Sequence, residues 1–337
     1  MHILKNKPII RVGNAALCVG LFLTAIFPSL ALAATNNGGE ALEIAPPVIY
    51  LSANPGQTLS TQILIRDIAG GNMLVSGQVN DFVAQGTDGT PKILLNSTEE
   101  ANDPYAMKSW VTALPGLDLV PQQIKPLTVT INVPITASPG GHYAVIRFTG
   151  TPPSLQGSGV SLTASIGVLV LLTVSGKIVN HLSVTQFYVS QNNKKASFFQ
   201  NGPVQFNELI KNTGNEQEQP TGIVTVKDMF GSVLANVPVN VPPSNVLPSS
   251  SRLYHQPLNS DIIGNKKLFG RYTANLTLSY GSSPKQTLTT SISFWVIPYK
   301  LIAIVIIILV AGFFLLRYLI RRYNQYVLKQ AQKRSRR

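Results

Sequence analysis

Histidine, the side chain that most often binds metals or acts as a general base, is rare in this chain. Beyond the first 33 residues the histidines are His142, His181 and His255. They lie far apart in sequence, and none has the short spacing that is typical of a metal site. We expect His142 to be a strand residue beside the Gly140–Gly141 turn, with a ligand role as the alternative. The sequence therefore predicts no metal site.

Carboxylates cluster at one place, where Glu99, Glu100 and Asp103 share the loop 96–104. We expect this loop to be an acidic, solvated surface segment. A calcium site is the alternative that the sequence leaves open. It would need further oxygen ligands, and the spacing is not that of an EF-hand.

Nucleophiles in a catalytic context are also missing from the sequence. No G-x-S-x-G elbow occurs, and Gly157-Ser-Gly159 lacks the strand–helix context of a phosphate loop. The single cysteine, Cys18, lies in the apolar segment near the N-terminus, so residues 34–337 offer no disulfide, thiolate ligand or cysteine nucleophile. We predict that the protein is not an enzyme and has no catalytic residues, no cofactor and no bound metal.

The first 33 residues have the three parts of a secretory signal peptide. Lys5, Lys7 and Arg11 precede the apolar run Ala15–Phe27, and Ala31-Leu32-Ala33 then supplies a small-x-small cleavage site. The sequence predicts that residues 1–33 are removed during export.

A second apolar segment lies near the C-terminus. Leu301–Leu316 contains no charged side chain, and about 20 such residues are needed to cross a bilayer as a helix. Trp295, Tyr299 and Tyr318 stand where interfacial aromatics are expected. We predict a transmembrane helix over residues 297–320. The alternative, a buried core helix, would require an all-round apolar cylinder to be hidden inside a β-domain.

The net charge of +13 belongs to the ends of the chain. Residues 34–299 carry 15 basic and 14 acidic side chains, whereas residues 300–337 carry nine basic side chains and no acid. This distribution predicts no nucleic-acid binding. Positive charge after the apolar segment predicts a cytoplasmic C-terminus and an extracellular N-terminal region. The basic tail, residues 321–337, is expected to contact anionic lipids.

Between the termini, short β-branched runs alternate with turn residues, which is typical of a sandwich or barrel. In Leu127–Val133 and Tyr272–Tyr280 the apolar residues occupy every second position, and Tyr272–Tyr280 is expected to form a hairpin with Leu288–Val296. His142–Phe148 is read as another alternating strand, and Ile166–Val174 as a central strand buried on both faces. We predict an all-β fold with two tandem sandwiches, at residues 34–177 and 178–296.

Several segments resemble the WxL-interacting proteins, a family of bacterial surface proteins. In the first half these are Ala53–Gln57, Ser109–Val111 and Leu127–Tyr143; in the second half they are Asn212–Asn215, Gly222–Val226, Asp228–Gly231 and Gly270–Tyr272. That family has a signal peptide, two immunoglobulin-like sandwiches, one helix and a basic tail. The resemblance implies attachment to the cell wall by the first domain and binding of protein or host-surface ligands by the second.

The sequence thus predicts a single-pass cell-membrane protein that acts in binding or adhesion at the cell surface. Its extracellular sandwiches would bind the cell wall or a surface protein, because loops and edge strands of sandwiches are ready recognition surfaces. A structural stalk or accessory subunit of a membrane-associated surface complex is the alternative. The sequence identifies no ligand, no binding residues and no oligomeric state.

Overall fold

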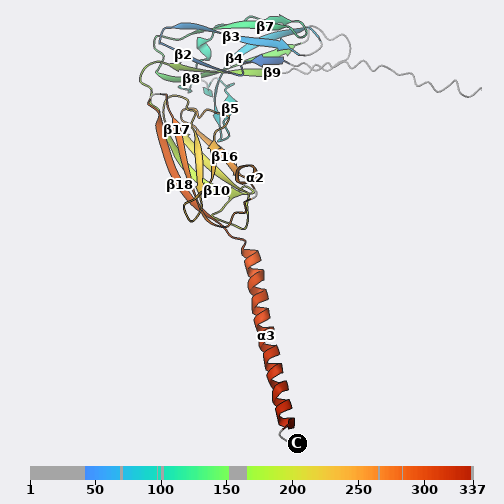
Figure 1. Cartoon of the computed structure of the whole chain (residues 1–337). Coiled ribbons are helices and arrows are strands. Elements are labelled where there is room, and N and C mark those ends of the chain that lie inside the picture. The colour runs from blue at the N-terminus through green and yellow to red at the C-terminus, as the bar shows by residue number, and fades with distance from the viewer. Residues whose placement is uncertain are drawn as a thin grey trace, which may run out of the picture. The chain divides into compact units, whose positions relative to one another are not determined.

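A computed structural model of the chain describes residues 42–68, 71–96, 98–99, 102–151, 165–264, 266–282 and 284–334 (Figure 1). The predicted signal peptide, residues 1–33, lies outside these ranges. In chain order the elements are β1 (Leu42–Ala45), β2 (Val48–Ala53), β3 (Thr58–Asp67), β4 (Met73–Gln85), β5 (Thr90–Ile93), the short 3₁₀ helix η1 (Lys108–Trp110), β6 (Leu117–Leu119), β7 (Ile124–Asn132), β8 (Gly140–Thr151), β9 (Ser165–Val174), β10 (Leu182–Gln191), β11 (Lys194–Lys195), β12 (Phe198–Phe199), β13 (Val204–Asn212), β14 (Thr221–Lys227), β15 (Val233–Val239), β16 (Ser251–Leu258), α2 (Ser260–Ile263), β17 (Gly270–Tyr280), β18 (Gln286–Val296) and α3 (Tyr299–Arg334).

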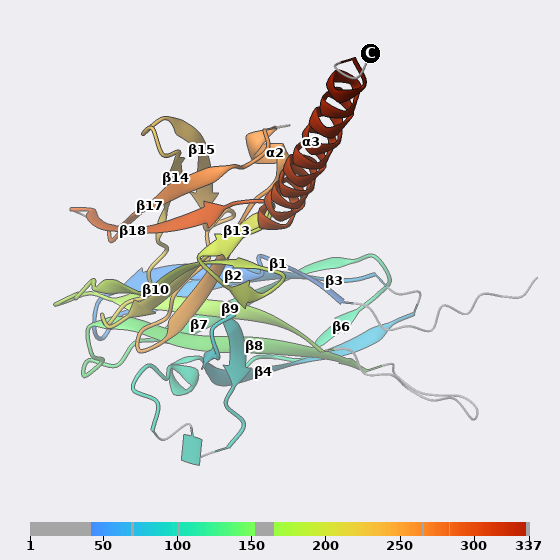
Figure 2. The ribbon, with the colours of Figure 1, turned by 90° about the horizontal axis from the view of Figure 1, so that it is seen from below.

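The first sandwich is built from two sheets. One has the strand order β1–β3–β7; the other has the order β2–β9–β8–β4, continued by β5 and joined by β6, which also pairs with β4 (Figure 2). Strands β2 and β9 pair in parallel and the remaining pairs are antiparallel. Apolar side chains from both sheets meet in one core, which includes Ile63, Ile65, Val129, Ile131, Ile146, Phe148, Val170 and Leu172.

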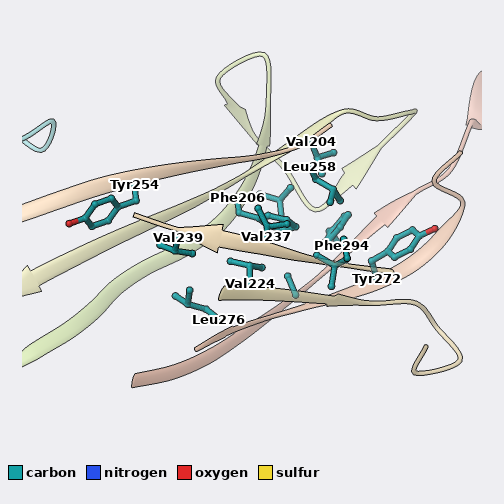
Figure 3. Close-up of a cluster of buried hydrophobic side chains, with 14 of the residues drawn as sticks. Val204, Phe206, Val224, Val237, Val239, Tyr254, Leu258, Tyr272, Leu276 and Phe294 are labelled. Atoms are coloured by element: carbon teal, nitrogen blue, oxygen red, sulfur yellow. The ribbon is translucent and has the colours of Figure 1, made fainter. Parts of the chain in front are cut away.

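The second sandwich packs a sheet of order β11–β10–β13–β16 on a sheet of order β12–β18–β17–β14–β15. Its core contains aromatic rings from both sheets (Figure 3). The Phe294 ring centroid lies 5.8 Å from that of Phe206 and 5.6 Å from that of Tyr272. Large rings remove much apolar area from water, so this contact is a major source of the second domain's stability.

The alternation predicted for Leu127–Val133 and for the hairpin of Tyr272–Tyr280 with Leu288–Val296 is confirmed. In β7, Leu127, Val129 and Ile131 are buried while the residues between them are more exposed. Strands β17 and β18 form the expected hairpin, with Tyr280 opposite Gln286 and Gly270 opposite Val296. A period of two buries one face because successive side chains in a strand point to opposite sides.

The predicted alternation of His142–Phe148 is wrong. These residues lie in β8, but His142 through Ile146 are all buried. Strand β8 lies between β4 and β9, with one face on the main core. The other face is covered at Tyr143, whose N–H donates to the carbonyl of Tyr105 at 2.8 Å and whose ring joins a second small apolar cluster with Phe82. The strand is therefore buried on both faces.

The C-terminal element α3 begins at Tyr299, with two residues between it and the end of β18 at Val296. Within its segment Tyr299–Gln325, an 18-residue window has a mean hydropathy of 2.8 and contains no buried residue, so the helix is long and apolar enough to cross a membrane. The helix also continues to Arg334, which makes the start of the predicted tail, residues 321–337, helical. The sandwich strands and this helix establish the predicted fold class: all-β, with tandem immunoglobulin-like sandwiches before one apolar helix.

Candidate binding site

Asn215 ties the second sandwich to the end of the first. Its carbonyl accepts the Gly141 N–H at 2.7 Å, and its side-chain amide donates to the carbonyls of Pro139 and Lys177, each at 3.0 Å. Its side-chain oxygen accepts the Val179 N–H at 2.7 Å. One side chain thus binds three backbone groups in two segments, near Pro139 and at 177–179, which orders the connection between the sandwiches.

A polar set of side chains continues this junction. Tyr143 donates its hydroxyl to Gln217 at 2.9 Å, and Thr173 donates to Glu216 at 2.7 Å. Burial raises the pKa of Tyr143, with the Glu216 carboxylate as a further cause. The hydroxyl therefore stays protonated and serves as a donor. A Cβ at Gly140 would lie 2.3 Å from the Asn215 carbonyl oxygen, so only glycine allows this approach.

A second contact joins the turn between β4 and β5 to the edge strand β16. The Leu253 N–H donates to the Thr87 carbonyl at 2.7 Å. Gly89, at φ +78°, sits against the Arg252 guanidinium, where a Cβ would lie 2.2 Å from Nη1. The positive φ favours glycine at this position, and the absence of a Cβ leaves room for the Arg252 guanidinium.

Between these contacts lies a hollow of about 220 Å³ with mostly apolar walls. Arg252 supplies its one charged side chain and donates from Nη1 to the Asn245 carbonyl at 2.9 Å. Strands β2, β4, β5 and β9 form one wall, and residues 243–252 form the other. The lining residues are Val48, Tyr50, Phe82, Ala84, Gly89, Pro91, Leu169, Leu171, Pro243, Ser244, Asn245, Leu247, Ser250, Ser251 and Arg252.

Tyr50 separates this apolar hollow from a polar one of about 200 Å³. Its hydroxyl oxygen accepts amide hydrogens from Asn245 at 2.8 Å and Gln219 at 3.0 Å. Glu218 lines the polar side, where one carboxylate oxygen accepts the Gly281 N–H at 2.9 Å. Burial raises the pKa of Glu218, and Glu216 adds to the effect. The two hollows form what we call the junction groove.

The junction groove has the chemistry of a recognition site. Apolar walls favour an apolar side chain, and the Arg252 fork is suited to a carboxylate beside it. A volume of about 220 Å³ is below the usual range of drug-sized ligand pockets, roughly 300–1,000 Å³. The apolar hollow therefore has room for a few side chains rather than for a drug-sized molecule.

Of the carboxylates considered for calcium, the two that the structure describes, Glu99 and Asp103, have other partners. Glu99 forms an ion pair with Lys92 at 2.8 Å, and Asp103 accepts the Tyr105 N–H at 3.0 Å. Burial raises the pKa of Asp103, which further disfavours its charged, metal-binding form. Glu100 lies outside the described residues. Among the residues that are described, no group of three or more His, Cys, Asp or Glu side chains has the arrangement of a metal site.

The three histidines lie in separate places. His142 is buried in β8, hydrogen bonds the Ser138 carbonyl through Nε2 at 2.9 Å and packs on Trp110. His181 bonds Thr213, and His255 bonds Asn207. Each has a structural partner, in line with the strand role expected for His142.

Sequence reasoning did not find the residues of the junction groove. Tyr50, Asn245 and Arg252 lie up to about 200 positions apart in the chain and carry no shared spacing. The one local signal is Asp88-Gly89, a turn dipeptide. This dipeptide predicts a turn, but it does not predict that the Arg252 guanidinium packs against the turn.

Fold and site together define a class: a tandem immunoglobulin-like β-sandwich protein with a groove between its sandwiches and an apolar C-terminal helix. No family model matches the sequence, and no curated protein matches it. The resemblance to WxL-interacting proteins therefore stays a prediction.

Among solved structures, the chain is similar to several chaperones of fimbriae. The YadV chaperone is 9% identical with a TM-score of 0.36, and the match covers 75% of this chain and 99% of that one. The class 5 fimbriae chaperone CfaA is 13% identical with a TM-score of 0.37, covering 74% and 98%. The E. coli chaperone DraB is 16% identical with a TM-score of 0.33, covering 74% and 98%. Similarities this low do not determine what this chain binds.

Proposed function

We propose that this protein is a membrane-anchored cell-surface binding protein that holds a protein partner in the junction groove. The observation that carries this proposal is the apolar hollow with one guanidinium, enclosed by both sandwiches. No catalytic residue is assigned in this proposal.

The walls of the groove favour a polypeptide over a wall polysaccharide. Its apolar part suits a hydrophobic side chain, whereas a sugar would need many polar contacts. Two edge strands border it: Tyr50 lies on β2, which pairs with β9, and Arg252 lies on β16, which pairs with β13. An extended partner segment beside such an edge gains main-chain hydrogen bonds, while the groove selects its side chains.

The proposed location follows from the helix and the charges. α3 spans the membrane once, the sandwiches at residues 34–177 and 178–296 lie outside the cell, and the basic C-terminus lies in the cytoplasm. The helix supports anchoring by its length and hydropathy. The orientation rests on the seven basic residues at positions 321–337, which follow the apolar segment.

Site-specific photo-crosslinking in intact cells tests the proposal. A photoreactive amino acid at Ala84, on the wall of the groove, is expected to capture a surface protein. Replacing Arg252 by Met in the same chain should reduce this capture by about tenfold or more, as for a lost charge-assisted hydrogen bond of about 1.5–3 kcal/mol. The matched control is Arg66→Met, which removes another guanidinium that pairs with Glu43 on the surface of the first sandwich.

Three outcomes contradict the proposal. Equal capture by the Arg252→Met and unchanged chains would remove the groove from recognition. Crosslinks from Ala84 to wall glycan would favour the cell wall as ligand. Capture of the same membrane proteins irrespective of Arg252 would favour a structural stalk, a role that the short connection from β18 to α3 also suits.

A further inference from the structure

One end of the second sandwich lies directly before the apolar helix. Trp295 and Val296 end β18, and only Ile297 and Pro298 separate them from α3 (Figure 1). The three residue steps from Val296 to Tyr299 span at most about 11 Å. The residues that the sheet places beside Trp295 and Val296 are therefore close to the start of the helix, and we call this region the helix-proximal end.

Large apolar side chains are exposed at the helix-proximal end. Phe198 pairs with Trp295 across parallel strands, and their rings stack with centroids 6.3 Å apart. Phe198 is 70% exposed, and Phe269, beside Gly270, is 61% exposed.

The turn between β14 and β15 reaches the same end. A Cβ on Gly270 would lie 2.0 Å from Cε of Met229, so Met229 packs on the residue opposite Val296. The next residue, Phe230, is 86% exposed. Isolated exposed apolar residues are ordinary, but several at one end mark an interaction surface.

The charge of the second sandwich is concentrated at this end as well. The helix-proximal end carries six basic residues against two acids, Asp228 and Asp261. Its basic residues are Lys194, Lys195, Lys227, Lys266, Lys267 and Arg271. Elsewhere in residues 178–296 three basic residues, Lys211, Arg252 and Lys285, stand against the acids Glu216 and Glu218, because Glu208 is buried in the core.

A hollow of about 710 Å³ opens at the helix-proximal end. Lys266, Lys267 and Phe269 lie on its wall together with Pro298 and Leu301 from the start of the helix. Cationic and aromatic groups thus surround a space beside the first turn of α3.

We propose that the helix-proximal end is a lipid-binding surface, which seats its aromatic side chains among the headgroups of an anionic membrane. Trp and other aromatic rings favour the membrane–water interface, and lysines near an anionic leaflet are attracted to it. A lipid surface is the occupant because α3 delivers this end to the bilayer. The proposal rests on the membrane anchoring proposed above.

Spin labels on single cysteines test the proposal in the full chain, reconstituted in phosphatidylglycerol/phosphatidylcholine vesicles. The only native cysteine is Cys18, in the predicted signal peptide. Phe230→Cys places a label at the helix-proximal end. Val241→Cys is the matched control, since Val241 is 73% exposed and follows β15 at the opposite end of the same sandwich. Leu309→Cys, in the middle of the apolar segment, reports anchoring itself.

A water-soluble relaxation agent should reach the label at 230 at least about fivefold less than it reaches the label at 241. The label at 309 should be shielded from this agent. Replacing Lys266 and Lys267 by Gln, or omitting phosphatidylglycerol, should restore access at 230, on the order of fivefold for each lysine. A label at 230 as accessible as that at 241, with 309 shielded, overturns the lipid surface but leaves anchoring intact. Exposure of 309 overturns anchoring.

Discussion

Glu208 is an acid within the core of the second sandwich. It lies on β13 between Phe206 and Ile210 on the inward face and is fully buried. Burial raises its pKa from 4.5 to about 8, and the neighbouring Gln256 amide offsets only part of this effect. A carboxyl group in such a site is neutral when the protein is folded at pH 7.

The sign of the resulting pH dependence follows from the two states. Below pH 4.5 the group is protonated both folded and unfolded, so it does not make stability depend on pH. Between 4.5 and about 8 the unfolded chain loses the proton while the folded chain keeps it, so stability falls as pH rises. Each pH unit costs about 1.4 kcal/mol, and the loss between pH 5 and pH 8 is about 4 kcal/mol.

Glu208→Gln tests this reasoning because the amide has nearly the same shape and no charge. The variant and the unchanged chain should have similar stability at pH 5. At pH 8 the variant should be more stable by about 4 kcal/mol, which raises the melting temperature of the second sandwich by on the order of 10 °C.

Thermal unfolding of the full chain in detergent at several pH values measures this difference. Glu43→Gln is the control, since Glu43 is exposed on β1. The comparison cancels the contributions of Glu218 and Asp103, which also have raised pKa values. A constant difference between Glu208→Gln and the unchanged chain from pH 5 to pH 8 would refute a buried, neutral Glu208.

Two further predictions concern the junction. Gly89→Ala combines a positive φ with a clash against Arg252, so it should lower the stability measured by thermal unfolding by about 2 kcal/mol. The control Gly71→Ala should not lower stability, because the space around Gly71 is open. Equal losses of stability in the two variants would contradict the close approach of Gly89 to Arg252. Asn215→Ala removes the hydrogen bonds to Pro139, Lys177 and Val179 and should speed trypsin cleavage after Lys177. Its control is Asn236→Ala, at an exposed position in β15. An unchanged cleavage rate in Asn215→Ala would show that Asn215 does not order the connection between the sandwiches.

The sequence by itself determined the features that repeat at short range. The period of two in β7, β17 and β18 predicted which side chains face the core, since each strand alternates its faces whatever its neighbours are. The uncharged run within α3 likewise predicted a membrane-length helix. The prediction failed in β8, where the second face is covered by the segment around Tyr105, far along the chain.

Only the tertiary structure decided what lies between and at the ends of the sandwiches. The contact of Arg252 with Gly89, the place of Tyr50 between two hollows and the burial of Glu208 depend on which strands and loops pack together. A side chain's own neighbours in sequence do not fix these distances, because burial, charge pairing and pocket shape arise when segments that are distant in the chain meet.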